Sequence, residues 1–196
     1  MPDLPPGRLS RADVVQAALD LLEAHGPAAL TLHAVARALG VRAPSLYNHV
    51  ESLGDLQQAM IVQVMRQVLA VPVPASSSQP SDALRALCEG FRALSRTRPS
   101  HVNWIITFPG DLGRAPLAEV WGQVLGRILG GVEGFPIPPE ARIHASYLVI
   151  SALAGFHRME LRGAIDPQDA DASFAWMVDR LVETLEALGP RRAQPG

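Results

Sequence analysis

The sequence has 196 residues, of which 48% are hydrophobic and 18% charged, and its formal net charge at pH 7 is −2. This composition suits a globular protein with a substantial core and excludes a disordered chain. The small net charge excludes a uniformly basic nucleic-acid binder, so any such surface must come from the distribution of charge. Because Cys88 is the only cysteine, no internal disulfide is possible, and a reducing cytoplasm is the expected compartment.

The first predicted helix begins at a capping-box pattern. Ser10 and Asp13 are spaced so that each side chain can pair with the other's backbone amide, and the helix runs to about His25. Residues 1–9 are expected to form a flexible arm, and Arg8 and Arg11 are candidates for contacts with phosphates or with a minor groove. The alternative for Arg8 is a disordered tail without such a contact.

Two short helices joined by a tight turn are predicted over residues 31–50. Thr31 is expected to cap the first helix, and Gly40 to enter the left-handed conformation that turns the chain. A small residue at Ala36 and an apolar one at Leu46 complete the spacing of a helix-turn-helix, because the first lets the helices cross closely and the second buries the second helix. A helical hairpin inside a bundle can carry the same apolar pattern.

The predicted outer face of the second helix favours DNA binding over a structural hairpin. Its side chains are polar groups that suit the major groove, and no acidic residue occurs between Glu23 and Glu51. We expect this surface to bind double-stranded DNA through Thr31, Arg37, Arg42, Ala43, Pro44, Ser45, Tyr47, Asn48 and His49. Of these, Arg42, Ser45 and Asn48 are the expected base readers. The side chains better placed for phosphates are those of Tyr47, His49, Thr31 and Arg37.

The segment Leu32–Val50 closely resembles the operator-binding segment of tetracycline-repressor-like (TetR) family regulators, and the match extends from about Arg11 to Met60. The resemblance implies an all-α bacterial transcriptional regulator, most often a repressor, with a small effector bound in its C-terminal domain.

The remainder of the chain is predicted to be helical, in two domains. A helix over 52–70 should connect the helix-turn-helix to the rest, and the Pro- and Ser-rich stretch 71–80 reads as a linker. We therefore predict a DNA-binding domain at 1–70 and an effector-binding and dimerisation domain at 81–190.

Three shorter helices are expected at the start of the second domain. Ser81 should cap a helix that ends before Pro99, and residues 100–108 form a short apolar helix. A helix over 116–129 should end at Gly130–Gly131.

The last two predicted helices, 140–162 and 167–188, are apolar on more than one face. Such helices are buried on two sides, so they are expected to form a subunit interface as well as a core. A DNA-binding unit with few positive charges binds weakly alone, which predicts a homodimer on a palindromic operator.

Large aromatic side chains gather beyond the linker, and core packing explains several of them. The alternative is a pocket for a small apolar or aromatic effector, lined by His101, Trp104, Phe108, Trp121, Tyr147 and Phe156. No cationic cluster is expected in this half, which argues against a polyanionic ligand. The dispersed arginines Arg114, Arg127, Arg142, Arg158 and Arg162 are expected to be solvated.

Other chemistry finds little support in the sequence. The histidines His101, His144 and His157 match no compact metal-ligand spacing, and no phosphate loop or nucleophile elbow is present. We predict no metal, no cofactor and no catalytic residue, and the longest apolar run is too short to span a membrane. The alternatives are a DNA-binding regulator without a small-molecule ligand, and a helical enzyme or scaffold with a structural helix-turn-helix.

Overall fold

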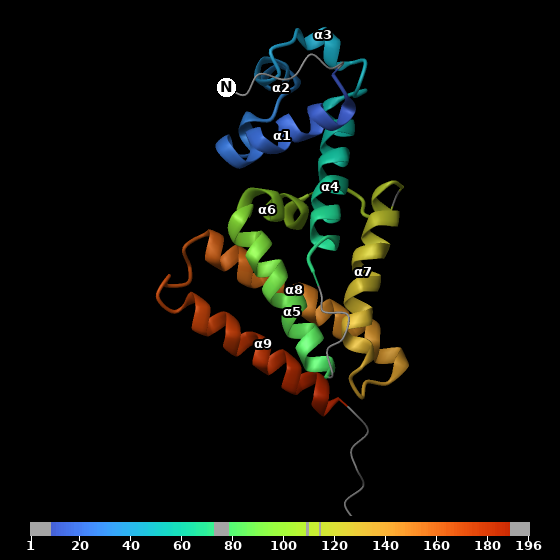
Figure 1. Cartoon of the computed structure of the whole chain (residues 1–196), viewed down its shortest axis with the longest axis vertical. Helices are drawn as coiled ribbons and strands as arrows, with labels where there is room; N and C mark the ends of the chain where they lie inside the picture. The colour runs from blue at the N-terminus through green and yellow to red at the C-terminus, as the bar shows by residue number, and fades with distance from the viewer. Residues whose placement is uncertain (1–8, 73–78, 109, 114, 189–196) are drawn as a thin grey trace, which may run out of the picture. The chain divides into compact units, whose positions relative to one another are not determined.

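A computed structural model describes residues 9–72, 79–108, 110–113 and 115–188, and within these ranges all of the regular secondary structure is helical, as predicted (Figure 1). The α-helices are α1 (Arg11–His25), α2 (Leu32–Ala38), α3 (Ala43–Leu46), α4 (Leu53–Leu69), α5 (Pro80–Thr97), α6 (Pro99–Thr107), α7 (Leu117–Glu133), α8 (Arg142–Leu161) and α9 (Ala170–Ala187). Two 3₁₀ turns, Pro27–Ala29 and Pro139–Ala141, precede α2 and α8.

The chain divides into two compact units. One consists of Met1–Val64 and Ser100–Gly110, and the other of Met65–Pro99 and Asp111–Gly196. Helix α4 contributes residues to both units, and α6 belongs almost wholly to the first.

The first unit has a core built from one face of each of its helices. The apolar stripe of α1 packs with α2, α3, the first turns of α4 and the half-buried Trp104 and Ile105 of α6. The capping box at Ser10 and Asp13 is present, with both reciprocal hydrogen bonds formed. The sequence prediction of the start of α1 is therefore confirmed.

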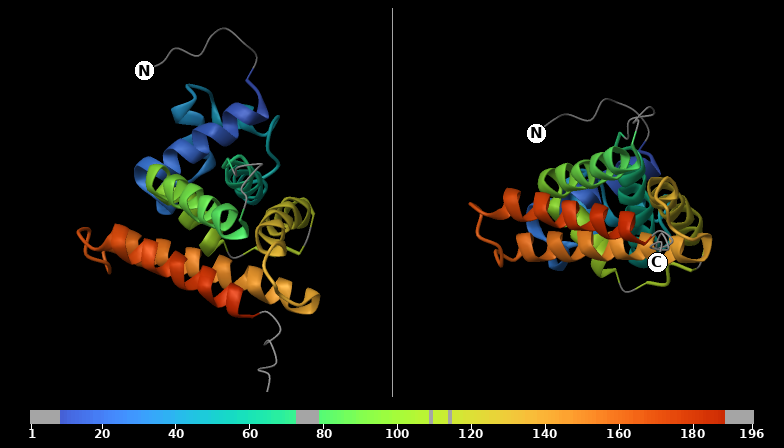
Figure 2. Two further views of the ribbon diagram at one scale, coloured as in Figure 1. Left: turned by 60° about the horizontal axis from the view of Figure 1, so that its bottom comes forward. Right: turned by 90° about the horizontal axis from the view of Figure 1, so that it is seen from below.

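The second unit is a bundle of α5, α7, α8 and α9. Helices α8 and α9 lie side by side along their length (Figure 2), and α5 contacts α7, α8 and α9. Leu84, Cys88 and Val149 are fully buried in this bundle. Burial raises the pKa of the Cys88 thiol to about 12, so this cysteine is an inert core residue.

Two helix ends differ from the sequence-based expectation. Helix α7 does not end at Gly130–Gly131 but continues to Glu133, because the buried side chains of Ile128 and Val132 fix its last turns and outweigh the low helix propensity of glycine. Helix α5 begins at Pro80 rather than after a Ser81 cap, since proline is well suited to the first helical turn.

None of the helices in the described ranges is both long enough and apolar enough to cross a membrane.

Candidate nucleic-acid interface

The turn between α2 and α3 forms as the sequence predicts. The Thr31 hydroxyl accepts a hydrogen bond from the Ala34 amide at 3.1 Å and so caps α2. Gly40 has a φ of +68°, in the left-handed region, and the Val41 amide donates to the Ala36 carbonyl at 3.0 Å. A residue with a Cβ at position 40 would be strained there, so this glycine sets the angle at which α3 leaves α2.

Helix α3 is short and is anchored by its apolar side chains. Only Ala43–Leu46 is regular α-helix, and residues 47–49 continue it as a turn that closes with a 2.9 Å hydrogen bond from the Val50 amide to the Leu46 carbonyl. Leu46 and Val50 are almost completely buried. Their burial holds the opposite face of α3 toward solvent.

The predicted DNA-binding residues lie on α2 with its cap and on α3 with the turn that follows it, and they differ in exposure. Tyr47 is 61% exposed, and Thr31, Arg37, Arg42, Pro44 and Asn48 are exposed as well. Ala43, Ser45 and His49 are half-buried, which differs from the expectation that all of them face freely outward.

The surface around α2 and α3 is free of acidic side chains between Glu23 and Glu51. The side chains of His33, Arg37 and Arg42 are exposed there. These exposed basic groups favour anionic phosphates, although the positive charge of the surface is modest.

An ion pair that the sequence did not reveal braces the end of α3. The guanidinium of Arg11 donates to the His49 carbonyl at 2.6 Å and binds both carboxylate oxygens of Asp55, at 2.6 and 2.9 Å. The same carboxylate accepts the Glu51 amide at 2.9 Å. The hydrogen bond from Arg11 lowers the pKa of Asp55 below its ordinary value.

This brace corrects the expectation that Arg11 reaches phosphates, because its guanidinium is engaged within the unit. The expected phosphate contact of Arg8 lies outside the described residues. Arg11 and Asp55 are 44 positions apart, and no local pattern in the sequence links them.

The predicted effector residues are divided between the two units. His101, Trp104 and Phe108 belong to the first, where the His101 ring is buried and the Trp104 and Phe108 ring centroids are 6.1 Å apart. Trp121, Tyr147 and Phe156 belong to the second, with Trp121 and Phe156 half-buried and Tyr147 exposed. Their role in ligand binding stays a prediction.

A small apolar cavity lies within the second unit. Its volume is about 30 Å³, and it is lined by side chains from the end of α4 and from α5, α7 and α8, among them Leu87, Phe91, Val124 and Leu153. Arg127 of α7 reaches this cavity, and its Nε atom is buried without a hydrogen-bond partner. Arg127 is therefore not the solvated residue that the sequence suggested.

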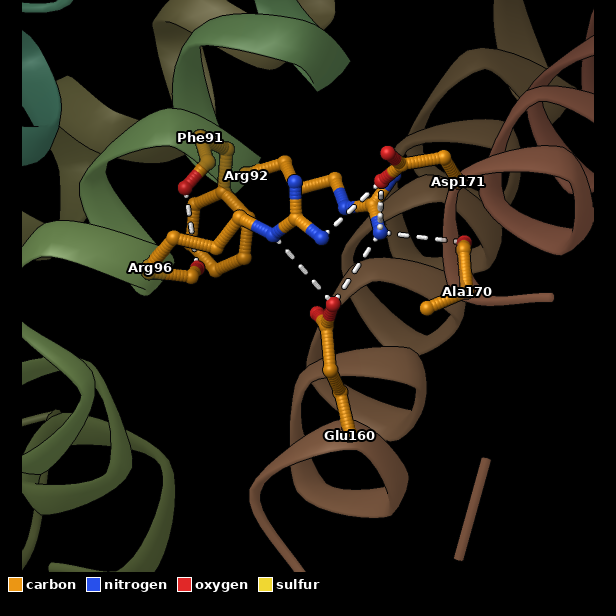
Figure 3. Close-up of polar contacts among 7 residues, drawn as sticks. Phe91, Arg92, Arg96, Glu160, Ala170 and Asp171 are labelled. Carbon is orange, nitrogen blue, oxygen red and sulfur yellow. Dashed lines mark hydrogen bonds and ion pairs between the residues drawn. The ribbon is translucent and has the colours of Figure 1, made fainter. Parts of the chain in front are cut away.

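A buried arginine joins α5 to α8 and α9 (Figure 3). The Arg92 guanidinium binds the carboxylates of Glu160 and Asp171 and the Ala170 carbonyl, each at 3.0 Å. It also lies 4.4 Å from the ring centroid of Phe174. These contacts compensate its burial, so the network is structural.

Among the described residues, no group of three or more histidine, cysteine, aspartate or glutamate side chains is placed to hold a metal ion.

Comparison with known families decides the identity of the fold. Residues 14–56 match the family described as bacterial regulatory proteins, tetR family, and residues 84–181 match the tetracyclin repressor-like C-terminal domain. The chain belongs to the TetR family. The resemblance seen in the helix-turn-helix segment and the all-α architecture are thereby confirmed, and the protein is a DNA-binding transcriptional regulator of a family that is not enzymatic.

Relatives of this TetR-family regulator support the assignment over most of its length. It is 30% identical over 183 residues to the uncharacterised HTH-type transcriptional regulator Rv0681 of Mycobacterium tuberculosis, covering 92% of this chain and 84% of that protein. It is 36% identical over 92 residues to the class D tetracycline repressor protein of Escherichia coli, covering 46% of this chain and 42% of the repressor. The chain spans less than half of that repressor's length.

Solved structures share the fold at low identity. SCO7222 from Streptomyces coelicolor, a TetR regulator, aligns with a TM-score of 0.74 at 20% identity, over 93% of this chain and all of that one. BioQ bound to its double-stranded DNA operator aligns with a TM-score of 0.66 at 21% identity, over 92% and 99% of the two chains. A TetR variant from Acinetobacter baumannii in complex with minocycline aligns with a TM-score of 0.68 at 22% identity, over 93% and 99%.

Proposed function

We propose that this TetR-family regulator is a homodimeric repressor that binds a palindromic operator and releases it when a small apolar effector binds. The observation that carries the DNA-binding part is the anchored helix α3. Its apolar side is buried through Leu46 and Val50, whereas Arg42, Tyr47 and Asn48 project from the other side.

The proposed reading scheme follows from the chemistry of the exposed groups. The Asn48 amide can donate to and accept from one adenine edge, and Arg42 can pair with a guanine edge. The Tyr47 hydroxyl, the Thr31 cap and Arg37 are suited to phosphates, with His49 beside them. Ala43, Pro44 and Ser45 form the first turn of α3 and would approach the groove floor.

The proposed dimer uses α8 and α9. Leu148, Ala152, Gly155 and Met159 follow one another at the spacing of a single helical stripe, and Leu148 and Met159 are among the largest exposed apolar groups. Trp176 of α9 is 64% exposed. Exposed apolar groups on adjoining helices favour a second copy of this chain as the partner, because a twofold axis buries the same patch twice.

Light scattering tests the dimer, and a gel shift tests the operator. We expect a dimer at micromolar concentration, and we expect Gly155→Glu to give folded monomers that lose the gel shift with DNA from upstream of the gene. The exposed substitution Gln16→Glu on α1 is the matched control. A monomeric parent that binds the same DNA with full affinity would contradict the proposal.

A regulator without a small-molecule ligand is the second candidate. The cavity in the second unit holds only about 30 Å³, roughly the space of one water molecule. An effector therefore has to enlarge it. If a library of apolar and aromatic compounds changes neither the melting temperature nor the gel shift, the ligand-free regulator is the correct description.

A further inference from the structure

We propose that the effector is an apolar monocarboxylic acid and that its carboxylate binds Arg127 in the cavity of the second unit. This inference rests on the proposed effector-responsive function and specifies the chemical class of the ligand. It begins with the contrast between one charged side chain and its apolar surroundings.

Arg127 is a cation without a carboxylate partner in the part of the chain that the structure describes. Its guanidinium donates one hydrogen bond, to the Val71 carbonyl, and its Nε atom is buried with no acceptor. The Nε atom of Arg92 is buried without an acceptor too, but the Arg92 guanidinium binds two carboxylates and a carbonyl, whereas Arg127 binds no carboxylate. An arginine keeps its charge under all conditions in which a protein folds, so Arg127 retains an unmet demand for an anion.

The remaining lining of the cavity is apolar and therefore favours a ligand with a hydrocarbon chain or ring. Its walls are the side chains of Leu87, Phe91, Val124, Ile128 and Leu153, and Arg127 is the only charged group among its lining residues. A ligand that fits both features has one negative charge and an apolar remainder. A second charge would be buried without a partner, which excludes dianions such as phosphate esters.

Val71 also lines the cavity. A Cβ added at Gly90 of α5 would overlap the Val71 side chain, so Val71 lies directly against the bare backbone of α5. Its carbonyl accepts the Arg127 hydrogen bond. Val71 is thus fastened on two sides, two residues after the end of α4.

A carboxylate competes with the Val71 carbonyl for the same donor. Hydrogen bonds between charged groups are about twice as strong as neutral ones, and guanidinium binds carboxylate through two parallel hydrogen bonds. Capture of Arg127 by the acid would free Val71, enlarge the cavity and release the end of α4. The reading helix shares its unit with the other end of α4, so this event lies on the chain path to the DNA-binding residues.

The experiment compares matched ligands on the intact protein. Calorimetry and thermal unfolding are measured with octanoate and decanoate and with octanamide and decanamide, which have the same carbon chains and no charge. We expect each acid to bind at least about tenfold more tightly than its amide and to raise the melting temperature. Arg127→Met should abolish the difference between acid and amide, whereas Arg66→Met, at an exposed position on α4, should preserve it.

Arg127→Lys protects the test against misfolding of the methionine variant, because it keeps the charge and should keep part of the preference. Equal binding of acid and amide to the parent protein would overturn the inference without any variant. If decanamide releases operator DNA and decanoate does not, the effector-responsive function stands and the monocarboxylate assignment falls. If no compound of either class binds or releases DNA, the monocarboxylate assignment falls, and the library of apolar and aromatic compounds decides separately whether the regulator responds to any effector.

Discussion

The Nε2 atom of His101 on α6 lies 3.0 Å from the carbonyl oxygen of Leu19 on α1. A carbonyl only accepts, so Nε2 carries a proton and donates this hydrogen bond. The His101 side chain is 1% exposed, and the Glu23 carboxylate of α1 accepts the amides of Ser100 and His101 at 3.5 and 3.4 Å. Helix α6 is therefore fastened at its first turn to the first helix of the DNA-binding unit.

This fastening predicts the effect of removing the imidazole. His101→Leu replaces the imidazole by an apolar side chain of similar size and removes the hydrogen bond to the Leu19 carbonyl. We expect the free energy of unfolding to fall by about 1–3 kcal/mol in urea denaturation. His33→Leu, at an exposed position on α2, should change it by less than about 0.5 kcal/mol. Equal stability of the two variants would show that the hydrogen bond to Leu19 contributes nothing.

The brace between Arg11 and Asp55 predicts a dependence on acid. Arg11 lowers the pKa of Asp55, so the stabilisation is present above the ordinary carboxylate pKa and is lost as the pH falls through the lowered value. Asp55→Asn should cost about 0.5–1 kcal/mol at pH 7, since the pair is partly solvated, and this difference should vanish in strong acid. Urea denaturation across pH checks it, with the exposed Asp20→Asn as control. A difference that is constant with pH would refute the assignment.

Burial of His157 predicts a second dependence of stability on pH, which comes from desolvation of an imidazole and not from an ion pair. Desolvation lowers the pKa of His157, an effect that the Pro99 carbonyl and Glu160 partly offset. The unfolded chain then binds a proton more readily than the folded one, so the free energy of unfolding falls as the pH drops from about 6.5 toward the lowered pKa. His157→Gln should flatten the melting temperature between about pH 7.5 and about pH 5.5, and the exposed His33→Gln should not. A parent curve with no slope in this range would contradict the prediction.

The Arg92 network should dominate the stability of the second unit. Arg92→Met leaves Glu160 and Asp171 with only the half-exposed Arg96; because both carboxylates still reach solvent, the loss of the charged hydrogen bonds of Arg92 should cost about 1.5–3 kcal/mol. Arg85→Met breaks the more exposed pair with Asp179 and should cost less than about 1 kcal/mol. Chemical denaturation distinguishes the two, and equal losses would mean that the Arg92 contacts carry no special weight.

The helix-turn-helix could be predicted from contacts between residues close in sequence. The features that could not be predicted depend on contacts between distant parts of the chain. The Thr31 cap, the Gly40 turn and the burial of Leu46 depend on neighbours a few residues away, so spacing alone predicts them. The brace from Arg11 to Asp55 joins positions that only the folded unit brings together. The same limit applies to Arg127, whose dispersed position among other arginines suggested solvent, whereas the fold places its Nε beside an apolar cavity.

In α7, the local helix propensity and the tertiary packing favour different ends of the helix. Two consecutive glycines at 130 and 131 favour a helix end by propensity. The side chains of Val132 and Phe135, which follow the two glycines, are buried. Their packing stabilises the continued helix by more than the glycines destabilise it, so α7 does not end at Gly130.

The central claim is that the outer face of α3 reads the operator, and selection of binding sequences from randomised double-stranded DNA tests it most directly. The parent protein should select a palindrome whose half-sites lie about one helical turn, or a multiple of it, apart. Asn48→Ala should lose about 1–3 kcal/mol on that site and tolerate any base at one position in each half-site, whereas Tyr47→Phe should weaken all sites alike. Both substitutions are at exposed positions, so folding is preserved. If both variants select and bind the parent's sequence with unchanged affinity, α3 is not the reading helix.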